Sequence, residues 1–275
     1  MPESTTYYAM GRSANETRRL MLQSELYAEH TDHLLVRAGL APGMRVLEVG
    51  CGAGDVSMQA ARLVGPTGSV IGIDTDAEVL AVARRRTAEA GITTVTYQQS
   101  NIADVRLDEP VDALIGRLIL IHLPDPVSAV RELSRFVRPG GVVSFQDFNI
   151  SRFRSVPPLP LVTACLGWIY AASRAGGLDL DAGGNITAVL SEAGLRTTGT
   201  ASSTPSGDAD SPMYDYTVAT IASLRPLIEK HGIATAEELD LDTLATRLRD
   251  EARAGQGVLH LPELVGSWAA VPTPQ

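Results

Sequence analysis

The feature that most constrains this chain is a glycine-rich segment placed directly after a short apolar run. Residues 44–49 (MRVLEV) predict a buried β-strand, Gly50, Gly52 and Gly54 follow it, and residues 56–64 predict a helix. In open parallel sheets such a turn lies at the carboxyl edge of the strands, where ligands bind. Glycine also lets a ligand approach the backbone without Cβ atoms in the way. The segment therefore predicts an α/β fold with a ligand at this turn.

Strand and helix periods alternate through the first half of the chain. Further strands are predicted over residues 69–74, 93–98, 111–116 and 142–148, and further helices over 77–90 and 126–137. Alternation at this spacing implies right-handed βαβ crossovers and hence a parallel sheet. We expect an α/β fold with a doubly wound, mostly parallel seven-stranded sheet and helices on both of its faces.

The net charge and the cysteine content limit the kinds of molecule that this chain is expected to bind. The chain has 275 residues, and its 23 Lys and Arg against 32 Asp and Glu give a net charge of −9, which opposes nucleic acid and anionic membranes. Cys51 and Cys165 support neither a disulfide framework nor a metal site. Residues 1–12 lack the apolar core of a secretion signal, and no window approaches a membrane span. We therefore expect a cytoplasmic monomer or homodimer with a small-molecule substrate, no metal, and no nucleic-acid or membrane partner.

The glycine spacing separates two classes of ligand. A dinucleotide-binding turn has the form G-x-G-x-x-G and needs glycine at position 55, which here is Asp55, while the third glycine comes one residue early. A carboxylate at this helix start would repel a pyrophosphate, and Glu48 adds negative charge near the turn. A cationic ligand with an ammonium and a sulfonium group is favoured, and a nicotinamide oxidoreductase is disfavoured.

A further acidic residue ends the next predicted strand. Asp74 follows Gly54 by 20 residues, where an acidic side chain can accept hydrogen bonds from both hydroxyls of a ribose. The alternative is that Asp74 only caps the following helix. Because Asp76 can fill that role, we favour ribose binding.

Four segments resemble the class I S-adenosylmethionine-dependent methyltransferases in their order and spacing: VLEVGCGAGD, VIGIDTD, SNIADV and DALIGRLILIHLPDP. The resemblance is strong over residues 41–150. Weaker likeness in YAMGRSANETRRLMLQ and PELVGSWAAV points to bacterial small-molecule methyltransferases. The resemblance implies a Rossmann-like domain that uses S-adenosyl-L-methionine and releases S-adenosyl-L-homocysteine.

The resemblance also implies a division of the chain. Residues 1–40 would form an N-terminal helical lid that begins with a helix over residues 13–39. Residues 41–275 would form the cofactor-binding domain, with helical insertions over the substrate site near 151–182 and 210–256. The elements predicted after residue 150 are helices over 157–175, 185–193, 213–230 and 236–254, and strands over 195–201 and 258–268.

Positions at the methionine end of the cofactor follow from the same resemblance. Glu48 and the glycine turn would hold the methionine part, the turn contributing Gly50, Cys51, Gly52 and Gly54. Arg117 and Leu118 would line this end of the site. From their place before the first predicted helix, Tyr7 and Tyr8 are also expected to close over the cofactor as a lid; the alternative is a frayed terminus.

The adenosine end involves the next two strand ends. Asp74 would bind the ribose and Thr75 would neighbour the adenine. Asn101 would contact the adenine amino group and Ile102 would pack on the ring. The family commonly has Asp where this chain has Asn101, a change that keeps an acceptor oxygen but loses the charge.

Two residues are candidates for acid–base chemistry. His122 follows the fourth predicted strand and has an ordinary pKa near neutrality, so it could be a general base. Alternatively it bonds to backbone or packs behind the cofactor. Asp147 ends the fifth predicted strand and could be a general base or a group that orients the substrate. Alternatively it is only a helix cap or a surface carboxylate. Gln146 is a similar but weaker candidate.

The sequence leaves two functions open. The first is methyl transfer to an O, N or C atom of a small apolar or aromatic metabolite, by in-line displacement at the sulfonium methyl group. The second is a protein of the same fold that binds the cofactor but catalyses a non-methylating reaction, such as a rearrangement or decarboxylation. Both need the same cofactor motif. A macromolecular substrate is disfavoured by the net charge.

Overall fold

A computed structural model describes residues 14–273, in a chain that divides into two compact units. The unit called the sheet unit here comprises Glu29–Asp147, Ala182–Ser202 and Leu264–Gln275. The helical unit comprises Met1–Ala28, Phe148–Asp181 and Ser203–Glu263. Helix α1 (Ala14–Ala38) contributes residues to both.

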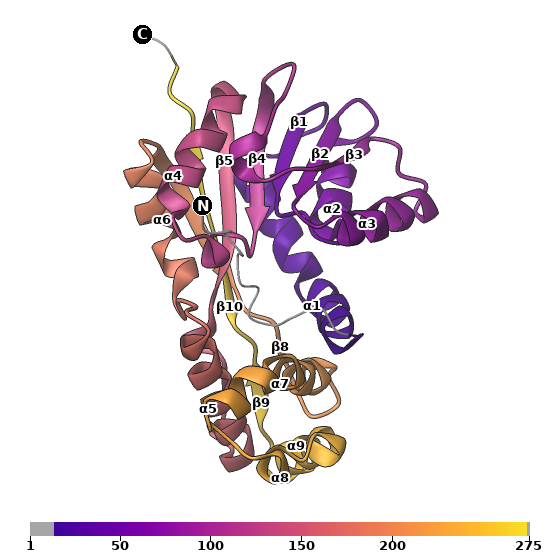
Figure 1. The fold of residues 1–275 in the computed structure, drawn as a ribbon, viewed down its shortest axis with the longest axis vertical. Helices are drawn as coiled ribbons and strands as arrows, with labels where there is room; N and C mark the ends of the chain where they lie inside the picture. Colours follow the sequence, from indigo (N-terminus) through magenta and orange to yellow (C-terminus); the bar gives the residue numbers. More distant parts are fainter. Residues whose placement is uncertain (1–13, 274–275) are drawn as a thin grey trace. The chain divides into compact units, whose positions relative to one another are not determined.

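The sheet unit is built on a seven-stranded sheet, in the order β3-β2-β1-β4-β5-β10-β7 (Figure 1). Its strands are β1 (Arg45–Val49), β2 (Ser69–Asp74), β3 (Val95–Gln99), β4 (Val111–Arg117), β5 (Val137–Asn149), β7 (Arg196–Ser203) and β10 (Glu263–Ala270). The pairs from β3 to β5 are parallel. Thr198 bonds to the carbonyl of Trp268 and Thr200 to that of Gly266, so β7 runs opposite to β10. The predicted mostly parallel sheet is confirmed.

Helices cover both faces of this sheet. Helices α4 (Pro126–Leu133) and α6 (Ala182–Glu192) share one buried core with the sheet. Helix α2 (Asp55–Val64) and the end of α1 form a second core with the sheet. The residues that β1 and β4 contribute to this second core alternate along each strand with those that they contribute to the first. Alternate residues of a strand face opposite sides of the sheet. The predicted double winding follows from these two cores.

Local sequence explains where the first crossover helices begin. Helix α3 (Ala77–Glu89) is capped by Asp76, whose carboxylate accepts from the backbone N–H groups of Glu78 and Val79. Helix α2 starts after Gly54, which has the left-handed φ of 83°. Short 3-10 turns, η1 (Ile102–Asp104) and η2 (Leu120–His122), follow β3 and β4, and a third, η3 (Ser134–Phe136), follows α4. The glycine turn, η1, η2 and the start of α3 thus gather at the carboxyl edge of the sheet, whereas η3 leads into β5 at the amino edge.

The helical unit contains α5 (Pro160–Ala175), α7 (Met213–Lys230), α8 (Ala236–Leu239) and α9 (Leu241–Gly255), with the 3-10 turn η4 (Ile150–Arg152). It also has a three-stranded sheet of β6 (Arg154–Val156), β9 (Val258–His260) and β8 (Ser206–Gly207), which pair antiparallel. The sequence did not predict β6 or β8, because strands of two or three residues have no readable period.

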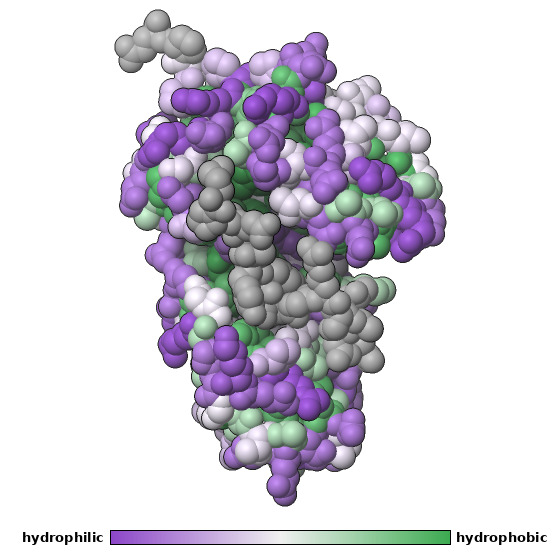
Figure 2. All heavy atoms as spheres, viewed as in Figure 1, coloured by the Kyte–Doolittle hydropathy of each residue, from purple (hydrophilic) through white to green (hydrophobic). Residues whose placement is uncertain are grey.

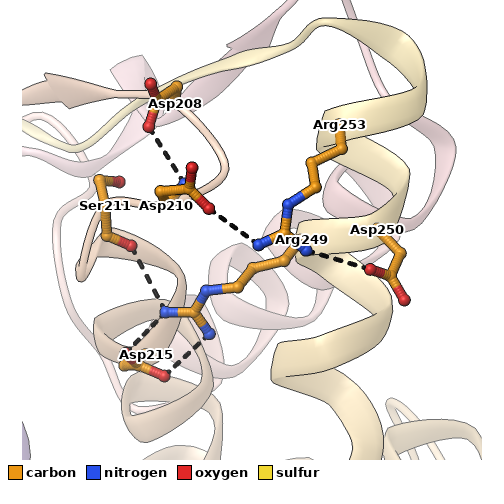
Figure 3. A network of polar contacts seen from close by, with 7 residues as sticks. All are labelled: Asp208, Asp210, Ser211, Asp215, Arg249, Asp250 and Arg253. Carbon is orange, nitrogen blue, oxygen red and sulfur yellow. Dashed lines mark hydrogen bonds and ion pairs between the residues drawn. The ribbon is translucent and has the colours of Figure 1, made fainter.

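Ion pairs fix α9 against α7 and the preceding loop in this unit (Figure 3). Arg249 donates to both carboxylate oxygens of Asp215, at 2.7 and 3.1 Å. Arg253 contacts Asp210 at 2.8 Å and Asp250 at 3.2 Å. Bidentate pairs such as the first orient both side chains as well as attract them.

Two predicted elements are each divided in the structure, the strand by two residues and the helix by one. The strand predicted over 258–268 is two strands in different sheets, β9 and β10, and Pro262 between them lacks the N–H that a continuous ladder needs. The helix predicted over 236–254 is divided into α8 and α9 at Asp240, which has φ 37°.

The surface shown in Figure 2 is largely hydrophilic, with smaller hydrophobic areas between the hydrophilic residues. Among the described residues, the exposed large apolar side chains are Met21, Val36 and Val156. Within residues 14–273 no helix is both long and apolar enough to cross a membrane. The same part of the chain contains no group of three or more His, Cys, Asp or Glu residues placed to hold a metal ion.

Candidate functional site

The glycine turn after β1 leaves one backbone position open. Cys51 N–H donates to the carbonyl of Ile73 at 3.0 Å, and Gly54 N–H donates to that of Cys51 at 2.9 Å. A Cβ atom at Gly54 would collide with the Tyr97 hydroxyl, whereas one at Gly52 would meet nothing within 4 Å. Gly52 also has φ 51°, which disfavours other residues. The turn therefore packs tightly against the rest of the protein at Gly54, whereas at Gly52 no protein atom occupies the space next to the backbone.

Asp74 at the end of β2 binds this turn. One carboxylate oxygen accepts from the Gly52 N–H at 2.9 Å, and the other accepts from the Asp76 N–H at 3.0 Å. The cap of α3 is Asp76, so Asp74 is not merely a helix cap. Each carboxylate oxygen has further lone pairs. Asp74 therefore combines a structural role with capacity to accept from a ligand.

Glu48 is a buried acid under the turn. Its side chain is 2% exposed and accepts a hydrogen bond from the Ser57 hydroxyl. Burial raises the pKa of Glu48 to about 8, against the lowering effects of the Ser57 hydrogen bond and of Arg117. The negative charges of Asp55 and Asp74 also act to raise this pKa, and the value of about 8 is the result of all these effects. Without a cationic ligand, this carboxyl group is largely protonated at neutral pH.

An arginine that sequence reasoning missed completes the turn. Arg86 on α3 donates to the carbonyl of Ala53 at 2.8 Å and to the carboxylate of Asp55 at 2.6 Å. The negative charge expected from Asp55 is thus paired within the protein. Glu48 and Asp74 are therefore the acidic residues near the turn that Arg86 does not pair with. No sequence signal identified Arg86, which lies among three consecutive arginines.

The segment after β3 holds Asn101 in a defined orientation. Its side-chain oxygen accepts from the Asp104 N–H at 3.0 Å, and its amide nitrogen donates to the Asp104 carboxylate. Ile102 is partly buried and packs against the core shared with α4 and α6. The carbonyl of Thr75 accepts from the Gln99 side chain at 3.1 Å. These residues lie at the ends of two paired strands, as the sequence predicts.

Arg117 and Leu118 lie where β4 leaves the sheet. Arg117 donates to the Thr31 hydroxyl of α1 at 2.9 Å. Leu118 has φ 55°, unusual for a residue with a branched side chain, and its N–H donates to the carbonyl of Gln146 at 2.7 Å. The Thr31 contact joins residues 86 positions apart and has no sequence signal.

The two predicted catalytic residues belong to one piece of structure. Asp147 is fully buried and its carboxylate accepts from the Ile121 N–H in η2 at 3.0 Å. His122 is the last residue of η2 and is partly buried. Gln146 is also buried and donates to the Thr31 carbonyl at 3.5 Å. The alternative that Asp147 is a surface carboxylate is therefore wrong. The predicted lid residues Tyr7 and Tyr8 lie outside the described residues.

Comparison with known proteins agrees with this geometry. Residues 40–167 match a family model described as a methyltransferase domain. A ubiquinone biosynthesis O-methyltransferase of Sodalis glossinidius (strain morsitans) is 38% identical over 120 residues, 43% of this chain and 47% of that protein. The protein of the same name from Pseudomonas savastanoi pv. phaseolicola is 42% identical over 115 residues, 41% of this chain and 47% of that protein. The chain spans about half the length of these curated relatives.

Solved structures show a likeness of fold. The YcgJ protein from Bacillus subtilis aligns with a TM-score of 0.58 and 17% identity, covering 89% of this chain and 100% of that one. The strand order, the glycine turn and the acidic strand ends together define an α/β domain whose glycine turn is open at Gly52. The match to the methyltransferase-domain family covers residues 40–167, a little under half of the chain.

Proposed function

We propose that this protein is an S-adenosylmethionine-dependent methyltransferase that acts on a small apolar or aromatic metabolite. The observation that carries the proposal is the turn around Gly52, which is open outward and held by the Asp74 carboxylate. The cofactor supplies an electrophilic methyl group on a positively charged sulfur. The acceptor is an O, N or C atom, and the names of the similar relatives favour oxygen.

The residues present fit such a ligand. Asp74 has lone pairs for ribose hydroxyls, and Asn101 and Ile102 lie one strand further along the edge, towards the adenine. The methionine end would lie against the turn, near Glu48 and Arg117. A buried Glu48 carboxylate favours a cation over a neutral ligand, because charge attraction is strong where water is excluded.

His122 is the proposed base for a substrate that loses a proton. The hydrogen bond from Ile121 to Asp147 holds η2, the turn that bears His122. Asp147 therefore acts here as a positioning residue, since its buried carboxylate already accepts a backbone N–H. Alignment at short distance supplies most of the remaining rate enhancement in a displacement of this kind. A monomeric or homodimeric assembly and a cytoplasmic location remain predictions.

Calorimetric titration tests the proposal. The protein is titrated with S-adenosylmethionine, S-adenosylhomocysteine and NAD, beside a Gly52→Arg variant whose side chain would fill the open position. We expect micromolar binding of both adenosyl ligands, none of NAD, and loss of binding in a variant that still melts cooperatively. Folded protein that binds neither adenosyl ligand would refute the proposal. Binding without any methylated product from a panel of aromatic alcohols and amines would favour the non-methylating alternative.

A further inference from the structure

A buried row of hydroxyl groups runs from Glu48 to helix α3. The Ser57 hydroxyl donates to the Glu48 carboxyl group. The Tyr97 hydroxyl is hydrogen-bonded to Ser57 and also to Thr87, at 2.8 Å from the latter. All four side chains are buried, and the most exposed of them is Tyr97 at 9%. The row therefore joins β1, α2, β3 and α3 beneath the glycine turn, largely shielded from water.

The backbone packs closely around this row. A Cβ atom at Gly54 would lie 2.3 Å from the Tyr97 hydroxyl oxygen. A Cβ atom at Gly72 on β2 would lie 3.0 Å from the Ser57 oxygen and 2.9 Å from the Tyr97 ring. Glycine at these two positions leaves the room that the hydroxyl groups occupy. Because the ring of a phenylalanine could pack equally well against the apolar neighbours of Tyr97, the hydroxyl group itself serves the hydrogen bonds.

A row of hydroxyl groups can serve a carboxyl group in both of its protonation states. Each hydroxyl group has one proton to donate and two acceptor lone pairs. With Glu48 ionised, Tyr97 can donate to Ser57 and Ser57 to Glu48, and bonds that point the same way strengthen one another. With Glu48 protonated, the directions reverse and no member is left unpaired. Tyr97→Phe should harm the ionised state more, because hydrogen bonds are stronger when the acceptor is charged.

The row is an important part of the environment of Glu48. Burial raises the pKa of this carboxyl group most, and the Ser57 hydrogen bond lowers it more than the charge of Arg117 does. The charged and titratable side chains that interact with Glu48 come from the turn, α2, β2, β3 and β4: Cys51, Asp55, Asp74, Tyr97 and Arg117. Burial also raises the pKa of the Cys51 thiol, which therefore stays neutral. The hydroxyl row and Arg117 together oppose the effect of burial.

We propose that Tyr97 is a positioning residue that acts through Ser57 to favour the ionised carboxylate of Glu48, and so strengthens binding of the cationic amino acid part of the cofactor. This inference rests on the proposed function, which places the methionine end near Glu48. The Tyr97 hydroxyl lies on the protein side of the turn at Gly54, whereas the ligand would lie at Gly52. Because one hydrogen bond is at stake, its contribution to affinity is roughly 2- to 10-fold.

The test measures the affinity for S-adenosylhomocysteine by calorimetry at pH 6.5 and pH 9. At pH 6.5 Glu48 must ionise on binding, so Tyr97→Phe should bind roughly 2- to 10-fold more weakly than the wild-type protein. At pH 9, above the pKa of about 8, Glu48 is largely ionised beforehand, and the difference should shrink to less than about 2-fold. Tyr27→Phe removes another buried hydroxyl group, which donates to the Pro262 carbonyl, and should bind like the wild-type protein at both pH values.

A double variant tests the route through Ser57. In a Ser57→Ala background, Tyr97→Phe should have no further effect at pH 6.5, because the link to Glu48 is already missing. An equal loss at both pH values, no loss at all, or an undiminished effect in the Ser57→Ala background would overturn the inference while leaving the proposed function intact. If the wild-type protein binds no S-adenosylhomocysteine at either pH, the proposed function fails and this inference fails with it.

Discussion

Replacing Glu48 by Gln should remove a pH dependence of folding stability that the buried carboxyl group creates. The pKa of Glu48 is raised by burial from 4.5 to about 8. Between these values the folded protein holds a proton on Glu48 that the unfolded chain releases. Stability from this group is therefore fully present below about pH 4.5 and is lost as the pH rises through about 8. The expected slope approaches about 1.4 kcal/mol per pH unit within this window.

The measurement is urea denaturation of the ligand-free wild-type protein and of Glu48→Gln at pH 5.5, 6.5 and 7.5. Other titrating groups contribute equally to both proteins, so the difference between their free energies of unfolding isolates Glu48. We expect this difference to shift in favour of the variant by about 1.4 kcal/mol for each added pH unit. A difference that stays constant from pH 5.5 to 7.5 would refute the assignment of a protonated Glu48.

The other predictions concern binding and rate. S-adenosylmethionine binding at pH 7 should release a proton from Glu48, seen as a dependence of the calorimetric enthalpy on buffer ionisation; no dependence would contradict it. Gly52→Ala should cost about 1 kcal/mol in unfolding free energy and weaken cofactor binding, while Gly91→Ala, also at positive φ with an open Cβ position, should cost a similar amount without affecting binding. His122→Asn should lower kcat by about 100-fold with cofactor affinity unchanged if His122 is the base, and an unchanged kcat excludes that role. Asp147→Asn should lower kcat less, with the pH profile of kcat retained.

The fold was predictable because its signals are local. Apolar runs such as residues 44–49 and 69–74 mark strands that are buried on both faces, and the glycines after β1 mark the turn. Asp76 was predictable as a cap because its side chain bonds to residues two and three positions ahead. The break at Pro262 was missed because the apolar character continues on both sides of it.

The site was predictable only in part, for a physical reason. Asp74 and Glu48 could be identified because strand ends in a parallel sheet share one edge. The contacts of Arg86 with Asp55 and of Arg117 with Thr31 join residues 31 and 86 positions apart, and their partners depend on how helices pack on the sheet. The pKa of Glu48 also depends on burial, which composition alone does not provide.

A crystal structure of the protein with S-adenosylhomocysteine would test the central claim most directly. We expect the ribose hydroxyls within hydrogen-bond distance of the Asp74 carboxylate, the amino acid part against the turn at Gly52, and the adenine amino group at the oxygen of Asn101. Density for the ligand elsewhere, with the space outside Gly52 filled only by solvent, would contradict it.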